Sequence, residues 1–85
     1  METRVAVMSI IVENNDSVEN LNSVLHDFGD YIIGRMGIPY KAKLINIICV
    51  ALDAPQDVIA SLSGKIGQID GISVKTAYSG FKSNE

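Results

Sequence analysis

The residues best suited to chemistry gather in one short stretch, in which two glycines flank Arg35. A guanidinium presents a planar fork of donors that matches a carboxylate or a phosphate, and glycines allow another group to approach the backbone closely. With Tyr40 as a wall, we predict a ligand-binding site for a small anionic metabolite formed by Gly34, Arg35, Gly37 and Tyr40. The alternative, which we favour, is an edge strand that its glycines bend into a hairpin, with Arg35 paired to an acid or a carbonyl at a subunit contact.

Catalytic and metal-binding residues are scarce in this chain. The sequence contains one histidine, His26, and one cysteine, Cys49, whereas a transition-metal site generally needs three or four nitrogen or sulfur ligands. Cys49 lies in the apolar stretch LINIICVAL, which is typical of a buried and inert thiol. We therefore predict no catalytic residue, no metal site and no cofactor, and we expect a protein that is not an enzyme.

The composition points away from nucleic acids and membranes. The net charge is −3 and the seven lysines and arginines are scattered, whereas nucleic-acid affinity comes mainly from clustered basic residues. No stretch approaches the roughly 20 apolar residues that span a bilayer, and the N-terminal apolar run is too short for a signal peptide. We expect a cytoplasmic protein that contacts no membrane and, by this chain alone, no nucleic acid.

The hydrophobic pattern predicts six elements that position these residues. Apolar side chains recur every three or four residues in two segments, which indicates two amphipathic helices. We expect Asp16 and Glu19 to cap the first helix, Gly29 to end it, and Pro55 to lie near the first turn of the second. The predicted order is strand 4–12, helix 17–28, strand 30–38, strand 44–52, helix 55–66 and strand 72–78.

This order is that of an α+β, ferredoxin-like βαββαβ sandwich, with a four-stranded antiparallel sheet of order 4-1-3-2 and two helices on one face. We predict one domain over residues 1–79 and a polar tail over 80–85. Segments 4–12 and 44–52 are near-continuous apolar runs, which are typical of central parallel strands. Within the sheet, we therefore expect these two strands to be central and to run parallel to each other.

The central strands carry apolar residues on both faces, although two helices can cover only one face of the sheet. A monomer would therefore expose an apolar patch larger than soluble monomers usually show. We predict a homodimer or homotetramer that packs sheet to sheet, with an interface that contains Val5, Val7, Ile11, Ile45 and Ile47. The alternative is a weakly polar exposed face beside obliquely set helices.

The stretches DFGDYIIGRMGIPY and DAPQDVIASLSGKIGQIDGISVKTAYS make the chain resemble a known family. Over residues 4–79 it is similar to the ACT-like family of candidate regulators of the iron-only hydrogenase system. The resemblance implies an ACT-like domain, oligomers formed through the sheets, and a role in hydrogenase maturation or expression. It also implies a fold related to the C-terminal domain of nickel-responsive repressors, although the several nickel-binding histidines of that domain are reduced here to His26.

Amino-acid-sensing ACT domains usually carry a glycine after the first strand, where this chain has NNDSV. We therefore expect a regulatory module that is oligomeric and either senses a small ligand or binds a protein partner. The alternative is a purely structural oligomerisation or docking domain without a small-molecule ligand.

Overall fold

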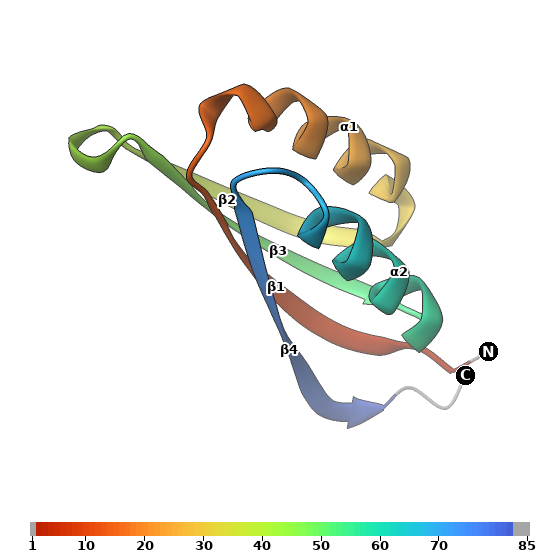
Figure 1. The fold of residues 1–85 in the computed structure, drawn as a ribbon. Helices are drawn as coiled ribbons and strands as arrows, with labels where there is room; N and C mark the ends of the chain where they lie inside the picture. Colours follow the sequence, from red (N-terminus) through yellow and green to blue (C-terminus); the bar gives the residue numbers. More distant parts are fainter. Residues whose placement is uncertain (1, 83–85) are drawn as a thin grey trace.

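The protein is represented by a computed structural model, and its structure is described over residues 2–82. Figure 1 shows two helices in front of a long, twisted sheet. The elements, in chain order, are β1 (Arg4–Val12), η1 (Asn15–Ser17), α1 (Val18–Asp27), η2 (Gly29–Tyr31), β2 (Ile32–Tyr40), η3 (Lys41–Lys43), β3 (Ile45–Ala54), α2 (Gln56–Gly67) and β4 (Ile72–Lys82).

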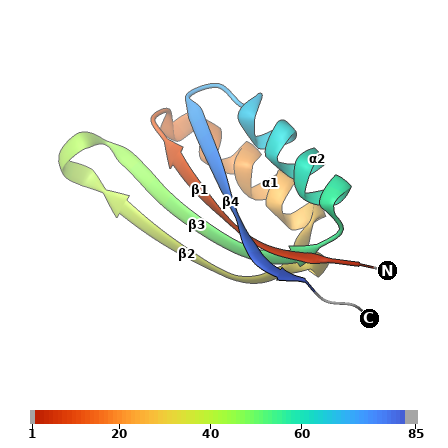
Figure 2. The same cartoon turned by 90° about the horizontal axis from the view of Figure 1, so that it is seen from below.

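The sheet has four strands in the order β2-β3-β1-β4, and every neighbouring pair is antiparallel. Both helices lie on one face of it, and the other face is open (Figure 2). The predicted α+β fold, with an antiparallel sheet of order 4-1-3-2, is confirmed. The expectation that the two central strands run parallel is wrong, because β3 turns back from β2 through a hairpin and so runs opposite to β1.

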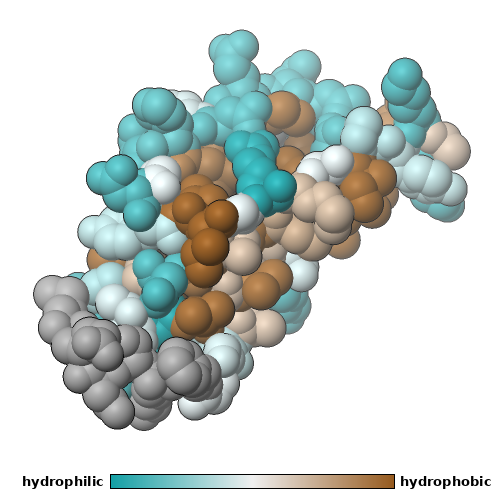
Figure 3. Space-filling view, turned by 180° about the vertical axis from the view of Figure 1, so that it is seen from behind, coloured by the Kyte–Doolittle hydropathy of each residue, from teal (hydrophilic) through white to brown (hydrophobic). Residues whose placement is uncertain are grey.

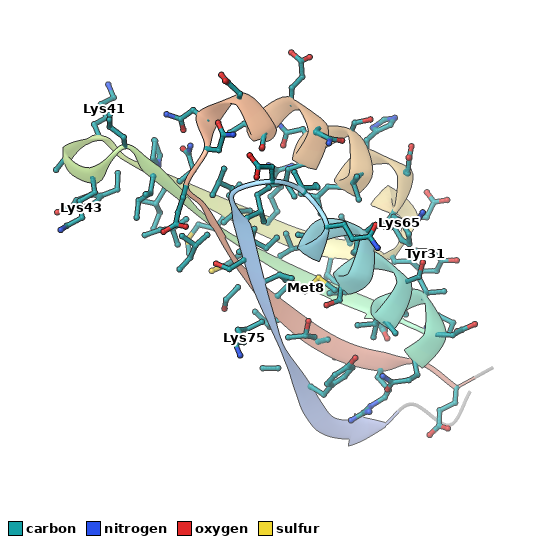
Figure 4. All side chains as sticks on the ribbon, in the orientation of Figure 1. Met8, Tyr31, Lys41, Lys43, Lys65 and Lys75 are labelled. Carbon is teal, nitrogen blue, oxygen red and sulfur yellow. The ribbon has the colours of Figure 1, made fainter. Side chains whose placement is uncertain are left out.

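The core lies between the sheet and the helices. Alternate residues of β1 and β3 point towards the helices and are buried, and Met8 lies between the two layers (Figure 4). The helices contribute leucines and isoleucines at helical spacing, so each buries a single stripe. The buried apolar side chains are Ala6, Met8, Ile10, Val12, Ile48, Val50, Leu52 and Ala54 from the strands, with Leu21, Leu25, Ile59, Leu62 and Ile66 from the helices.

Several boundaries differ from the sequence-based expectations. β2 continues through Pro39 to Tyr40, because the missing N–H of a proline is tolerated on an edge strand. The first helix begins after Ser17, whose hydroxyl donates to the Asp70 carbonyl at 2.6 Å, so the expected capping box does not form. The last strand extends to Lys82, into the segment expected to be a polar tail, and residues 83–85 of that segment lie outside the described residues.

Candidate functional site

Arg35 lies on the helix-facing side of the edge strand β2. It pairs with Val50 of β3, which is buried against the helices. Its Nη2 donates to the Oδ1 of Asn22, on α1, at 2.8 Å. The guanidinium therefore links β2 to α1 within the same chain.

The other predicted ligand-binding residues do not converge on Arg35. Gly37 pairs with Ile48 and shares the helix-facing side, whereas Gly34 and Tyr40 pair with Ala51 and Ile45 on the open face. The register of β2 shifts between Ile32 and Gly34, so a bulge at Ile33 separates the strand into two alternation patterns. The sheet therefore divides the four predicted residues between its two sides.

Two hollows lie on the surface of the described residues. One, of about 340 Å³, lies between the helices and is lined by Asn20, Val24, Asp27, Lys65, Gln68 and Ile69. The other, of about 220 Å³, lies under the β2–β3 hairpin and is lined by Tyr40 with Asn15, Pro39, Lys41, Leu44, Ile45 and Asn46. Asn46 Nδ2 donates to Asn15 Oδ1 at 2.8 Å across one side of it. Tyr40 thus lines a hollow, whereas Gly34, Arg35 and Gly37 line neither of these two.

The five residues predicted to form an interface share the open face of the sheet. Val7, Ile11 and Ile47 lie on it, since Val7 and Ile11 alternate with buried neighbours and Ile11 pairs with Ile47. Val5 pairs with Asp53, and Ile45 lies two residues before Ile47 on the same face. Figure 3 shows this side of the molecule, where hydrophobic side chains form a band along the sheet with hydrophilic ones around it.

Edge strand β2 adds three large apolar side chains to this face that sequence reasoning did not assign to it. Met36, Ile38 and Tyr40 are 57%, 46% and 46% exposed, and they pair with Cys49, Ile47 and Ile45. The two-residue alternation of Met36, Ile38 and Tyr40 is the signal in the sequence, but the predicted strand ends at Ile38 and so leaves Tyr40 out. With these residues, the apolar surface extends across β2, β3 and β1.

His26 and Cys49 lie far apart in the fold. His26 is exposed on α1, whereas Cys49 is half-buried on the open face of β3. Within residues 2–82, no group of three or more His, Cys, Asp or Glu side chains is arranged to hold a metal ion. In the same part of the chain, no helix has the length and apolar content needed to cross a membrane.

Comparison with solved structures places this fold beside two bacterial proteins. The protein TM1266 from Thermotoga maritima superposes with a TM-score of 0.86 at 35% sequence identity, covering 89% of this chain and 96% of that one. A formyltetrahydrofolate deformylase from Pseudomonas putida KT2440 superposes with a TM-score of 0.62 at 11% identity, covering 86% of this chain and 28% of that one. The second likeness shows the fold alone.

No curated protein matches the sequence. Residues 4–76 match the family TM1266-like, described as "Iron-only hydrogenase system regulator, putative". The match spans most of the chain and agrees with the likeness to the Thermotoga protein. The chain therefore belongs to the TM1266-like family.

Proposed function

We propose that this protein is a non-enzymatic, ACT-like regulator of the iron-only hydrogenase system that acts as an oligomer formed through the open face of its sheet. The family description supports the regulatory role. The observation that carries the oligomer is the apolar open face, on which Val7, Ile11, Met36, Ile38 and Tyr40 are each more than 40% exposed. Apolar patches of this kind on soluble proteins commonly mark interaction sites.

The size of the face suits a stable association. The Cα extents of the molecule are 44 × 19 × 17 Å, so its long side has a projected area on the order of 800 Å², comparable to what each partner contributes to an interface of ordinary size. Burial of apolar surface contributes about 25 cal/mol per Å² before the costs of association are subtracted. A sheet face that stays in water does not need large apolar side chains such as Ile11 and Met36. In an oligomer these side chains would pack against the partner subunit.

A second candidate function is a purely structural oligomerisation domain without a small-molecule ligand. It is favoured by the division of Gly34, Arg35, Gly37 and Tyr40 between the two sides of the sheet. A thermal-shift screen with small carboxylates and phosphates separates this function from that of a regulator that senses a small ligand. A sensor would be stabilised by about 2.7 kcal/mol at a hundredfold excess of ligand over its Kd, whereas a structural domain would not respond.

The regulatory role is tested in cells that contain an iron-only hydrogenase and lack the gene for this chain. We expect the wild-type chain to restore the hydrogenase level, and the variant Ile11→Asp, which places a charge on the open face, to fail. The matched control is Ala60→Asp, an exposed position on α2. Hydrogenase levels that do not depend on the chain would refute the regulatory role, and equal rescue by the two variants would refute the role of the open face.

A further inference from the structure

The open face is divided into rows that differ in side-chain size. Cross-strand pairing aligns one residue from each strand, in the order β2, β3, β1 and β4, to make each row. Three adjacent rows occupy the centre of the face. They are the isoleucine row (Ile38, Ile47, Ile11 and Ser73), the middle row (Met36, Cys49, Ser9 and Lys75) and the small row (Gly34, Ala51, Val7 and Ala77).

The isoleucine row and the small row lie on opposite sides of the middle row. Ile47 and Ile11 form the centre of the isoleucine row, and Ala51 and Val7 occupy the corresponding places of the small row. The side chains of the isoleucine row therefore rise higher above the sheet than those of the small row. A surface with one high row and one low row is complementary to a copy of itself that is turned end for end, so that the high row of each copy faces the low row of the other.

Resting on the self-association proposed above, we infer that a second copy of the chain packs on the open face about a twofold axis that runs along the middle row. A rotation about this axis reverses the order of the rows and keeps the order of the strands. Ile47 then lies over Ala51 of the partner subunit, and Ile11 lies over Val7 of the partner subunit. Each isoleucine row fills the space above a small row, which gives the close packing found in protein interiors.

The competing twofold axis runs parallel to the strands, and it fits the surface less well. It keeps the order of the rows and reverses the order of the strands, so the isoleucine row meets the isoleucine row of the partner subunit. The two small rows would then face each other across a gap, because facing sheets are held about 10 Å apart by their bulkiest side chains. An unfilled gap loses the contacts that stabilise a packed interface.

The charges at the two ends of the face agree with the end-for-end arrangement. Lys41 and Lys43 lie at the tip of the β2–β3 hairpin, beyond the isoleucine row (Figure 4). Asp53 is exposed at the other end of β3, beyond the small row. Reversal of the rows brings the basic tip of one copy towards Asp53 of the partner subunit, and such complementarity helps to fix the orientation of an interface.

The middle row coincides with the proposed axis, so its residues face their own counterparts. Lys75 is exposed at the β4 edge and points away from the helices (Figure 4), so its ammonium group can remain in water at the rim. Cys49 and Ser9 are the small residues at the centre of the row, where two copies approach most closely.

Cross-linking between cysteines placed on the two edge strands, β4 and β2, tests the axis. All variants carry Cys49→Ser, which removes the native thiol, and contain one new cysteine from Ser73→Cys, Ala77→Cys or Ile38→Cys. A short bismaleimide is added to equimolar pairs, after light scattering has established that the wild-type protein and each variant self-associate. We expect the Ser73→Cys and Ala77→Cys pair to cross-link at least ten times faster than either variant alone, because the proposed axis places these positions opposite each other.

The outcomes distinguish this inference from the proposal on which it rests. Preferential cross-linking of the Ser73→Cys and Ile38→Cys pair would show the axis parallel to the strands and would overturn the inference, while self-association would stand. Equal rates for all pairs would also overturn it. Monomeric wild-type protein in the light-scattering step would instead refute the proposed self-association.

Discussion

Ile11 of β1 and Ile47 of β3 are direct cross-strand neighbours, and both side chains point away from the helices. Their sequence neighbours Ile10 and Ile48 also pair with each other, but on the buried side. Adjacent isoleucines in one strand thus belong to two different surfaces of the sheet. This relationship makes it possible to separate folding from association by substitutions one residue apart.

Ile10→Ala and Ile11→Ala should have different consequences. Ile10 is completely buried, so its truncation should lower the free energy of unfolding by about 2–5 kcal/mol. Ile11→Ala should leave the monomer fold largely intact and weaken self-association by about tenfold or more, because several methylene groups are lost from each half of the interface. Chemical denaturation of both variants measures their stability, and sedimentation equilibrium measures their association. An unchanged association constant for Ile11→Ala would count against the interface.

Lys75→Gln should strengthen self-association. In the end-for-end arrangement the two Lys75 side chains approach each other at the rim, and like charges oppose association. We expect a several-fold lower dissociation constant at low ionic strength and a smaller gain at high salt, since salt screens exposed charges. The control is Lys65→Gln, at the hollow between the helices, which should have no such effect, and a weaker dimer for Lys75→Gln would contradict the axis.

Gly71→Ala should destabilise the fold, whereas Gly64→Ala should not. Gly71 has a φ of +73°, and a Cβ atom there would lie 2.5 Å from the Cβ of Asn14. Its carbonyl also accepts the Glu13 amide at 2.7 Å, which ties the turn to the end of β1. We expect a loss of more than about 1 kcal/mol for Gly71→Ala, and a gain of about 0.5–1 kcal/mol for Gly64→Ala in α2, where a Cβ meets nothing within 4 Å. Thermal and urea denaturation measure both.

Arg35→Ala and Asn22→Ala should have small and non-additive effects. The two side chains form one exposed hydrogen bond of 2.8 Å, so each truncation should lower the free energy of unfolding by less than about 1 kcal/mol. The double variant should cost no more than the larger single one, because the bond can be lost only once. A strictly additive double variant would show that the two side chains contribute independently and that the bond between them does not stabilise the fold.

The element order could be predicted because the apolar periodicities are long and the turns carry glycine, proline and asparagine. The hairpin between β2 and β3 indicates the direction of β3 relative to β1, whereas the near-continuous apolar runs favour a parallel pair. That run has another cause: one side of each central strand forms the core, and the other forms the half-exposed face that contains Ile11 and Ile47.

The two-residue period of a strand already divides the candidate ligand residues, with Arg35 and Gly37 opposite Gly34 and Tyr40, but it does not place Ile32 correctly. A strict alternation along β2 places Ile32 and Gly34 on one face, whereas the bulge at Ile33 puts them on opposite faces. Nothing in the sequence IIGRMG distinguishes the position of that bulge, because the bulge depends on pairing with β3. The bond between Arg35 and Asn22 likewise depends on how α1 lies over the sheet. Assignment of the open-face residues of β1 and β3 needed only the two-residue period of a strand.

The mass of the protein in solution tests the central claim most directly. Light scattering at micromolar concentration should give at least twice the 9.2 kDa mass of one chain, and the mass should fall towards that of one chain for Ile11→Asp but not for Ala60→Asp. A wild-type protein that scatters as a single 9.2 kDa chain across this range would contradict the account.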